Sequence, residues 1–361
     1  MSQLFKPITI NGMEISNRFV RSATNESLVD SEGYVTDRLG DMYEELAKGG
    51  VGLIITGYAY VRPDGKSSLM QAAIYDDKFI PAYKKLTKRV HKYKTKIALQ
   101  IAHGGRQTKP KICGCIPIAP SAITDSSSGI TPKAMNENDI RNIIKCFGQA
   151  ARRAKEAGFD GVQLHAAHGY LLSEFISPYT NRRTDKWGGS IENRTRILLE
   201  VLKECRKEVG RDYPILIKLN SMDGISDGLN IKESILIAIA LDNHGIDAIE
   251  VSGGIAEAGA VTARTGIRSK KDEAYFSDNA RRIKQCVSVP VICVGGIRSV
   301  EVMEGIIKNR KADMIALSRP LIREPDLVNK IREGTKTKAD CISCNQCWNP
   351  EGIRCAHLPK T

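Results

Sequence analysis

Short apolar segments rich in β-branched residues alternate with helical patterns along the whole chain. The strand candidates are residues 19–21, 52–56, 97–101, 161–164, 215–219, 248–251, 291–294 and 314–317. The helical patterns begin near residues 37, 77, 136, 191, 231, 278, 299 and 325, several with Asp, Ser or Asn at the capping position. Strand–helix units repeated in this way predict a parallel sheet. They fit a closed (β/α)8 TIM barrel better than an open doubly wound sheet, which remains the alternative.

Polar residues gather where these predicted strands end, and such barrels carry their chemistry at the carboxyl ends of the strands. The segments concerned are residues 22–25, 56–58, 103–106, 165, 252–254, 295–296 and 318–319. Two further polar residues, Gln100 and Lys218, lie inside otherwise apolar strands. Burying them is costly unless a polar or anionic group meets them, so both are candidate ligand contacts.

The residues after the last two strands predict a phosphate site. Gly295 and Gly296 follow the seventh strand, and Ser318 and Arg319 follow the eighth. Loops at these positions often bind phosphate through backbone N–H groups and a cation, and glycine lets the backbone approach closely. A glycine pair alone is equally typical of a tight turn, so it is the combination with Arg319 that favours phosphate.

Residues 165–194 carry the densest group of proton-handling side chains. His165 and His168 stand three positions apart, and Tyr170 follows two positions later, between a predicted strand and a predicted helix. The alternatives are a zinc pair or a structural pair for the histidines, and an ordinary half-buried aromatic for Tyr170. An HxxH pair without a nearby third ligand is a poor metal signal, so we interpret the three residues as catalytic. The rest of the stretch, up to Arg194, is expected to shape the loop and cap the next helix.

The composition is that of a soluble globular protein, with 42% apolar and 26% charged residues. No apolar run approaches the roughly 18 residues of a membrane helix, and the first residues lack a secretory signal, so we expect a cytoplasmic protein without a membrane partner. The net charge of +13 is compatible with nucleic acid, acidic lipid or anionic metabolites. A solvated basic surface is the simpler interpretation, because a nucleic-acid partner requires a motif as well as charge.

Ten cysteines without a secretory signal predict thiols or metal ligands rather than disulfides. Cys341, Cys344 and Cys347 follow a C-x2-C-x2-C spacing, and Cys355 comes soon after them. Such thiolates can hold a [4Fe–4S] cluster or a zinc ion, or stay free or redox-paired, because ligand type alone does not choose the metal. A polar linker precedes them, so we predict a barrel over residues 1–335 and a short Cys-rich C-terminal extension over residues 336–361.

Taken together, several segments resemble the old yellow enzyme family of FMN-dependent NADH:flavin oxidoreductases. They are GMEISNRFVRSAT (12–24), GLIITG (52–57), ALQIAHGGR (98–106), PIAPSAI (117–123), residues 165–194, VSGG (251–254), VGGI (294–297) and ALSRPLIREP (316–325). The resemblance covers residues 3–332, and the 165–194 stretch is its most specific part. Two positions depart from many relatives: Ala23 replaces a proline, and Asn25 stands where a threonine or cysteine tunes the flavin.

The resemblance implies FMN across the carboxyl end of the barrel. Its phosphate would meet Gly295, Gly296, Ser318 and Arg319. Gln100 would bond the flavin pyrimidine, and Lys218 would lie near flavin N1, where a cation favours the reduced anion. The other residues implied around the cofactor are Ala23, Thr24, Gly57, Tyr58, Gly253 and Gly254. His165 and His168 would donate hydrogen bonds to a substrate carbonyl, flavin N5 would pass hydride to the β-carbon, and Tyr170 would give a proton to the α-carbon.

The cysteine tail resembles the branch of that family that includes trimethylamine dehydrogenase and 2,4-dienoyl-CoA reductase, which carry a [4Fe–4S] cluster just after the barrel. The first three cysteines match that pattern, and the gap to Cys355 is shorter than in it. Those relatives continue into a second nucleotide-binding region. Because this chain stops at Thr361, we expect no internal FAD or NADH domain.

These observations predict a cytoplasmic ene-reductase that takes hydride from NAD(P)H and reduces an activated C=C bond, of enone or enoyl type, in a small molecule. An oxidative alternative is an amine dehydrogenase or demethylase that passes electrons through the cluster. A further alternative is a dihydrouridine synthase, which would need an RNA-binding extension after the barrel. The short, cysteine-rich tail (336–361) does not resemble such an extension. The remaining alternative is a flavoprotein for electron transfer or redox sensing. We expect a homo-oligomer, and a separate electron-transfer partner is left open.

Overall fold

Eight parallel strands form a closed ring in the computed structural model, which describes residues 2–349 and 351–358. They are β3 (Phe19–Arg21), β4 (Leu53–Ile55), β6 (Lys96–Ala102), β9 (Gly161–Ala166), β10 (Ile215–Asn220), β11 (Ala248–Ser252), β12 (Val291–Cys293) and β13 (Met314–Leu317). The ring closes because β13 pairs with β3 and β4 pairs with β6. The predicted (β/α)8 barrel is therefore confirmed, and every predicted strand belongs to it.

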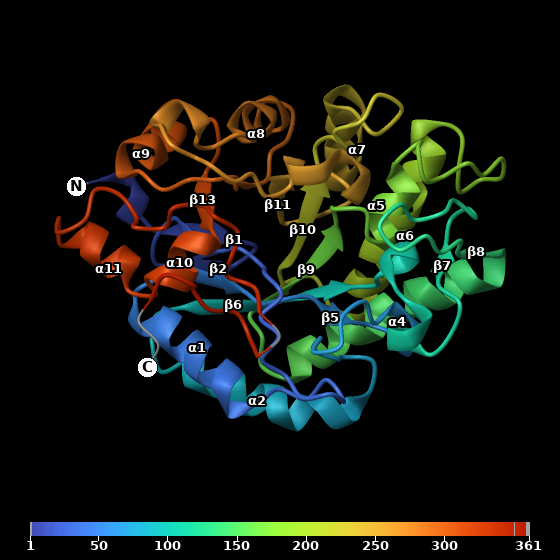
Figure 1. The fold of residues 1–361 in the computed structure, drawn as a ribbon, viewed down its shortest axis with the longest axis horizontal. Helices are drawn as coiled ribbons and strands as arrows, with labels where there is room; N and C mark the ends of the chain where they lie inside the picture. Colours follow the sequence, from blue (N-terminus) through green and yellow to red (C-terminus); the bar gives the residue numbers. More distant parts are fainter. Residues whose placement is uncertain (1, 350, 359–361) are drawn as a thin grey trace.

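Helices surround the ring and pack their apolar faces against it (Figure 1). They are α1 (Asp37–Lys48), α2 (Ile80–Val90), α4 (Glu137–Glu156), α6 (Ile191–Val209), α7 (Ile231–Asn243), α8 (Ser277–Lys284), α9 (Val300–Lys308) and α11 (Leu327–Arg332). Asn136 caps α4 and Asn230 caps α7, each in a capping box with an acidic residue three positions later. Polar caps of this kind made the helix starts predictable.

A hairpin that the sequence interpretation missed closes the amino-terminal end of the barrel. Strands β1 (Ile8–Ile10) and β2 (Met13–Ile15) pair antiparallel through a two-residue turn. Asn11 and Gly12 occupy that turn with φ angles of 43° and 78°. An Asn-Gly pair between apolar residues is a strong hairpin signal. The apolar side chains of the hairpin pack against inward-facing residues of the barrel strands, so this end of the barrel is a packed core.

Shorter elements lie in the loops between the barrel strands and helices. They are β5 (Ala59–Tyr60), β7 (Ile118–Ala119), β8 (Lys133–Ala134), α3 (Pro110–Cys113), α5 (Leu171–Ile176), α10 (Arg319–Arg323) and the 3-10 turns η2 (Pro63–Gly65), η3 (Asp77–Phe79), η4 (Gly105–Gln107), η5 (Ala256–Val261) and η6 (Lys270–Asp272). A further turn, η1 (Gln3–Phe5), precedes the hairpin. No helix within the described ranges is both long and apolar enough to cross a membrane.

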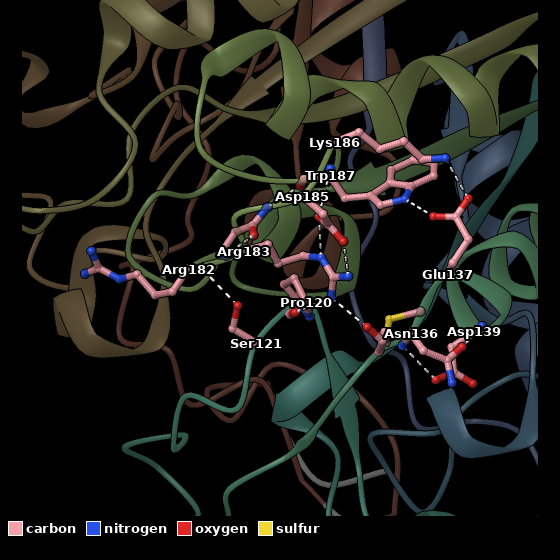
Figure 2. Close-up of polar contacts among 12 residues, drawn as sticks. Pro120, Ser121, Asn136, Glu137, Asp139, Arg182, Arg183, Asp185, Lys186 and Trp187 are labelled. Carbon is pink, nitrogen blue, oxygen red and sulfur yellow. Dashed lines mark hydrogen bonds and ion pairs between the residues drawn. The ribbon is translucent and has the colours of Figure 1, made fainter.

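The loop between α5 and α6 is held by a polar cluster (Figure 2). Arg183 pairs with Asp185 and donates to the carbonyl oxygens of Pro120, at 2.9 Å, and Met135, at 2.6 Å. Trp187 Nε1 donates to Glu137 at the start of α4. The loop is therefore fastened to the segments that follow β6, in agreement with the scaffolding role expected for this part of the 165–194 stretch.

The described part of the tail folds back across the carboxyl mouth of the barrel. Lys338 forms a β-bridge with Ser299, and Arg298 Nη1 donates to the carbonyl of Cys341 at 2.7 Å. Farther along, Ile353 N donates to the carbonyl of Glu26 at 2.7 Å. The tail thus runs from the loop after β12 to the loop after β3. It is part of the red segment in Figure 1. The predicted domain boundary at residue 335 stays a prediction.

The cap of α7 gives a test of how the helix start is fixed. Asn230 Oδ1 accepts from Lys232 N at 3.0 Å and Glu233 N at 3.3 Å. Asn230→Ala removes both bonds, so we expect the free energy of unfolding to fall by about 1 kcal/mol in denaturant titrations. Asn243→Ala, at the exposed end of the same helix, is the matched control and should change it by less than about 0.5 kcal/mol. Equal losses in the two variants would contradict the capping account.

Candidate active site

A cavity of about 450 Å³ opens at the carboxyl ends of the strands. The predicted site residues that line it are Ala23, Thr24, His168, Lys218, Gly295, Gly296, Ser318, Arg319 and Cys347. The other predicted residues, Gly57, Tyr58, Gln100, His165, Tyr170, Gly253, Gly254, Cys341, Cys344 and Cys355, are absent from its lining. The tail supplies part of one wall through Ser343, Asn345, Trp348 and Ile353, which the sequence did not predict.

Gly295 and Gly296 form a narrow part of the wall after β12. Their φ angles are 126° and 67°, which lie in the region that favours glycine. A Cβ atom at Gly295 would lie 3.0 Å from the Tyr275 ring, and one at Gly296 would lie 2.8 Å from it. Elsewhere in the lining, the Ser318 and Thr24 hydroxyls are 2.7 Å apart and so join the loops after β13 and β3. Glycine at these two positions therefore allows the Tyr275 ring to pack closely against the backbone.

Two arginines lie at this end of the cavity, and only Arg319 was predicted. Arg319 Nη1 donates to the carbonyl of Arg264 at 2.8 Å and to Asn345 Oδ1 at 2.5 Å. Arg298, 6% exposed, donates to the Cys341 carbonyl, while its Nε has no hydrogen-bond partner among the described residues. Arg298 stands two residues after the glycine pair, so its basic side chain was a signal available in the sequence.

The remaining predicted glycines serve close packing around the cavity. Gly57 N donates to Glu26 Oε1 at 3.1 Å, and Tyr43 Oη donates to the same oxygen at 2.8 Å. Burial raises the pKa of Glu26, and the neighbouring Arg21 opposes that shift. A Cβ atom at Gly253 would lie 2.8 Å from the Phe276 ring. Gly253 therefore allows a close approach between the loop after β11 and that ring.

Lys218 and Gln100 lie in one buried hydrogen-bonded chain. Lys218 Nζ is 2.9 Å from Ser22 Oγ and 3.2 Å from Glu250 Oε1. Gln163 Nε2 donates to Glu250 Oε2 at 2.8 Å, and Gln100 Nε2 donates to Gln163 Oε1 at 2.7 Å. Gln163 and Glu250 are fully buried and were missed, although each is a polar residue inside an apolar strand, as Lys218 is. Of the residues in this hydrogen-bonded series, only Lys218 and Ser22 line the cavity.

The structure brings His165, His168 and Tyr170 together at the end of β9. The His165 ring centroid lies 5.2 Å from that of His168 and 4.9 Å from that of Tyr170. His168 has a φ of 64°, and its backbone is held by bonds from Gln107 Nε2 to its carbonyl, at 2.6 Å, and from its N–H to Asn220 Oδ1, at 3.1 Å. The left-handed backbone conformation of His168 turns the chain after β9, and its imidazole lies next to that of His165.

Burial keeps both imidazoles neutral. It lowers the pKa of His168 to about 3 and the pKa of His165 well below its usual value, and the Lys218 cation lowers both further. His168 Nε2 lies 2.7 Å from Ser252 Oγ, while His165 Nδ1 is buried without a partner among the described residues. The two rings can therefore present N–H donors to a ligand without carrying charge.

Tyr170 keeps its proton. Its Oη donates to Tyr58 Oη at 3.1 Å, and burial raises the pKa of Tyr170 well above its usual value. Both rings are half-buried at the mouth of the barrel, with centroids 5.2 Å apart. Tyr58 thus orients the Tyr170 hydroxyl from the end of β4.

The loop after β6 forms a buried charged cluster beside this trio. Arg106 is fully buried, with Nη2 2.7 Å from Glu257 Oε1 and its backbone N–H 2.8 Å from Glu174 Oε1. Burial raises the pKa of Glu174 to about 8, and the Arg106 charge only partly offsets this. His103 lies 3.2 Å from Asp64, so both basic residues of the predicted 103–106 segment pair with carboxylates.

The four tail cysteines lie near one another without forming a ligand set. Burial, with the proximity of the other three thiols, raises the pKa of Cys347 to about 11. Cys355 Sγ accepts a bond from Arg323 Nη1 at 3.3 Å. In residues 2–349 and 351–358, no group of three or more Cys, His, Asp or Glu side chains is arranged to hold a metal ion. The thiol arrangement therefore does not by itself fit a metal or cluster, and no chemical step is assigned to one.

The sequence model of the NADH:flavin oxidoreductase / NADH oxidase family matches residues 3–338. The chain is 40% identical to an NADH oxidase of Thermoanaerobacter brockii, covering 95% of this chain and 52% of that protein. It is 34% identical to a cinnamate reductase of Clostridium sporogenes, covering 95% of this chain and 55% of that one. The chain thus spans about half the length of these two curated relatives.

A solved structure extends the likeness to a protein of similar size. The old yellow enzyme homologue from Zymomonas mobilis superposes with a TM-score of 0.80 at 26% identity. The match covers 95% of this chain and 97% of that one. Both the sequence model and the fold therefore point to the same group of flavin enzymes.

The neutral histidines predict a loss of stability in acid. Unfolded histidine titrates near pH 6.5, whereas the pKa of folded His168 is about 3. Between these values the unfolded chain binds a proton that the folded chain excludes, so the free energy of unfolding falls as pH falls below 6.5. His168→Asn should make this fall shallower, by up to about 1.4 kcal/mol per pH unit, in denaturant titrations from pH 6.5 to pH 5.

His244→Asn, at an exposed histidine after α7, is the matched control and should keep the wild-type slope. A His168→Asn protein with the wild-type slope would show that His168 is not held neutral in the folded chain.

Proposed function

Because the chain belongs to the NADH:flavin oxidoreductase / NADH oxidase family, we propose that it uses FMN and NAD(P)H to reduce activated C=C bonds in small molecules. The observation that carries this proposal is the convergence of His165, His168 and Tyr170, with the His165 ring centroid 5.2 Å from that of His168 and 4.9 Å from that of Tyr170, beside a cavity that Lys218 lines. Donors of this kind suit a substrate on which negative charge develops during the reaction.

The side chains around the cavity fit FMN. Gly295 and Gly296 line the cavity, and so do Arg298 and Arg319, so backbone N–H groups without side chains and two cations share one lining, as a phosphate group requires. Lys218 is a further cation in the lining, and Ala23 and Thr24 belong to the same lining. When bound there, FMN would supply the hydride that no side chain can provide.

The protein's own contribution begins with the imidazole donors. His165 and His168 would donate N–H bonds to the carbonyl or carboxyl oxygen of the substrate, which draws electron density from the conjugated C=C bond. Because both rings are neutral, they stabilise the developing oxyanion by hydrogen bonding and do not protonate it outright. His165 Nδ1 has no hydrogen-bond partner among the described residues, so it is not already committed to another group.

Tyr170 would hold the proton that completes the reduction. Its raised pKa keeps the phenol protonated until a basic enolate carbon forms next to it. Tyr58 accepts the Tyr170 hydroxyl bond and so holds the phenol in place, and the O–H would turn from Tyr58 to the α-carbon when it gives up its proton. The likeness to a cinnamate reductase supports a conjugated alkene as substrate, whereas the particular compound is left to experiment. A cytoplasmic location and a homo-oligomer also stay predictions.

A direct test follows the colour of the flavin. The purified protein should carry FMN, lose its visible absorption when mixed anaerobically with NADH or NADPH, and regain it with cyclohexenone or cinnamate in stopped-flow mixing. A reduced protein that no alkene reoxidises would contradict the proposal and favour an electron-transfer or sensing role.

Tyr170→Phe separates the two half-reactions. Removing the hydroxyl takes away the general acid, so reoxidation by the alkene should slow by about 10²–10⁴-fold while reduction by NAD(P)H stays unchanged. Tyr58→Phe is the matched control, because it removes only the partner of that hydroxyl and should have a smaller effect. Unchanged reoxidation in Tyr170→Phe would exclude this residue as the proton donor.

The tail cysteines were predicted to hold a [4Fe–4S] cluster or zinc or to stay free, and their arrangement in the described residues does not fit a metal site. Metal analysis separates these alternatives, because a cluster would give anaerobically purified protein about four iron and four sulfide ions per chain. If a cluster is present, the Cys347→Ser protein should lose the iron and sulfide. The Cys205→Ser protein, changed at a buried cysteine of α6, should keep both. Iron and sulfide near zero in the wild-type protein would remove the cluster.

A further inference from the structure

The Lys218 ammonium group faces the cavity with a buried carboxylate directly behind it. Glu250 lies 3.2 Å from Lys218 Nζ, is fully buried, and does not line the cavity. Strand pairing fixes this arrangement, because Lys218 on β10 stands in register with Glu250 on β11. On its other side, Lys218 is in register with His165 on β9. Side chains in register on parallel strands share one face, so the three residues point into the same interior.

Two further contacts hold the Glu250 carboxylate in place. Ser22 Oγ donates to Oε1 at 2.6 Å while it also lies 2.9 Å from Lys218 Nζ. Gln163 Nε2 donates to Oε2 at 2.8 Å and is itself held by Gln100. Both carboxylate oxygens therefore have donors, as an ionised buried carboxylate requires. Among the described residues, Lys218 forms no ion pair with any other acidic group.

We propose that Glu250 is a positioning residue that lowers the reduction potential of the flavin by neutralising Lys218. This inference rests on the proposed FMN site. A lone buried lysine would stabilise the negative charge of reduced flavin and so raise the potential. The Glu250 carboxylate opposes that effect through Lys218, because the pair carries no net charge. A lower potential gives the reduced cofactor more driving force toward weakly activated alkenes, such as conjugated carboxylates.

The test is the two-electron potential of bound FMN, measured by anaerobic equilibration with reference dyes. Glu250→Gln keeps the side-chain size but removes the charge, so the equilibrium should shift toward reduced flavin by at least tenfold, which is about 30 mV for a two-electron couple. Asp247→Asn is the matched control: it also removes a carboxylate, one residue before β11, from an ion pair with Arg206 of 2.6 Å. Asp247→Asn should keep the wild-type potential.

A charge-balanced pair of variants covers the case in which Glu250→Gln fails to fold. Lys218→Met leaves the carboxylate unopposed and should shift the equilibrium at least tenfold toward oxidised flavin. Adding Glu250→Gln to it removes both charges and should reverse that shift. The inference is overturned if Glu250→Gln shifts the potential no more than Asp247→Asn does, or if the double variant matches Lys218→Met. Wild-type protein without bound flavin would instead overturn the proposed function itself.

Discussion

Polar side chains that point into a closed barrel are shielded from water, so each needs a partner on a neighbouring strand. The structure meets this requirement by strand register: Lys218 stands between Glu250 and His165, and Gln100 stands beside Gln163. The same register puts His165 and Lys218 at one level of the barrel, and of the two only Lys218 lines the cavity. The strand register that gives these buried polar groups their partners therefore also fixes which of them lines the cavity.

Much of the architecture was predictable because it depends on local pattern. Apolar strands, capped helices and their alternation were enough to specify the barrel, since few folds accommodate eight such units. Closure then brings distant residues to one edge, as with Thr24 and Ser318, whose hydroxyls lie 2.7 Å apart. The glycine pair at residues 295–296 was recognisable for the same reason, because its place in the chain is tied to a strand end.

The features that were missed depend on contacts between segments. Glu250 and Gln163 gave the same signal as Lys218, a polar residue in an apolar strand, but their pairing follows from register that only the folded ring reveals. The crossing of the tail over the mouth rests on contacts such as that between Ile353 and Glu26. Cysteine spacing likewise says how near the tail thiols are along the chain, and not whether their sulfur atoms converge.

Closure of the ring also sets an order of events during synthesis. Strand β3 pairs with β4 on one side and with β13 on the other, where Ile315 N donates to the carbonyl of Arg18. Contacts between such distant segments are slow to form, and until they form, β3 presents an unpaired edge to other chains. The cavity mouth therefore cannot exist before residues 314–317 have emerged from the ribosome. A nascent chain without β13 lacks one of the two partners that β3 has in the closed ring.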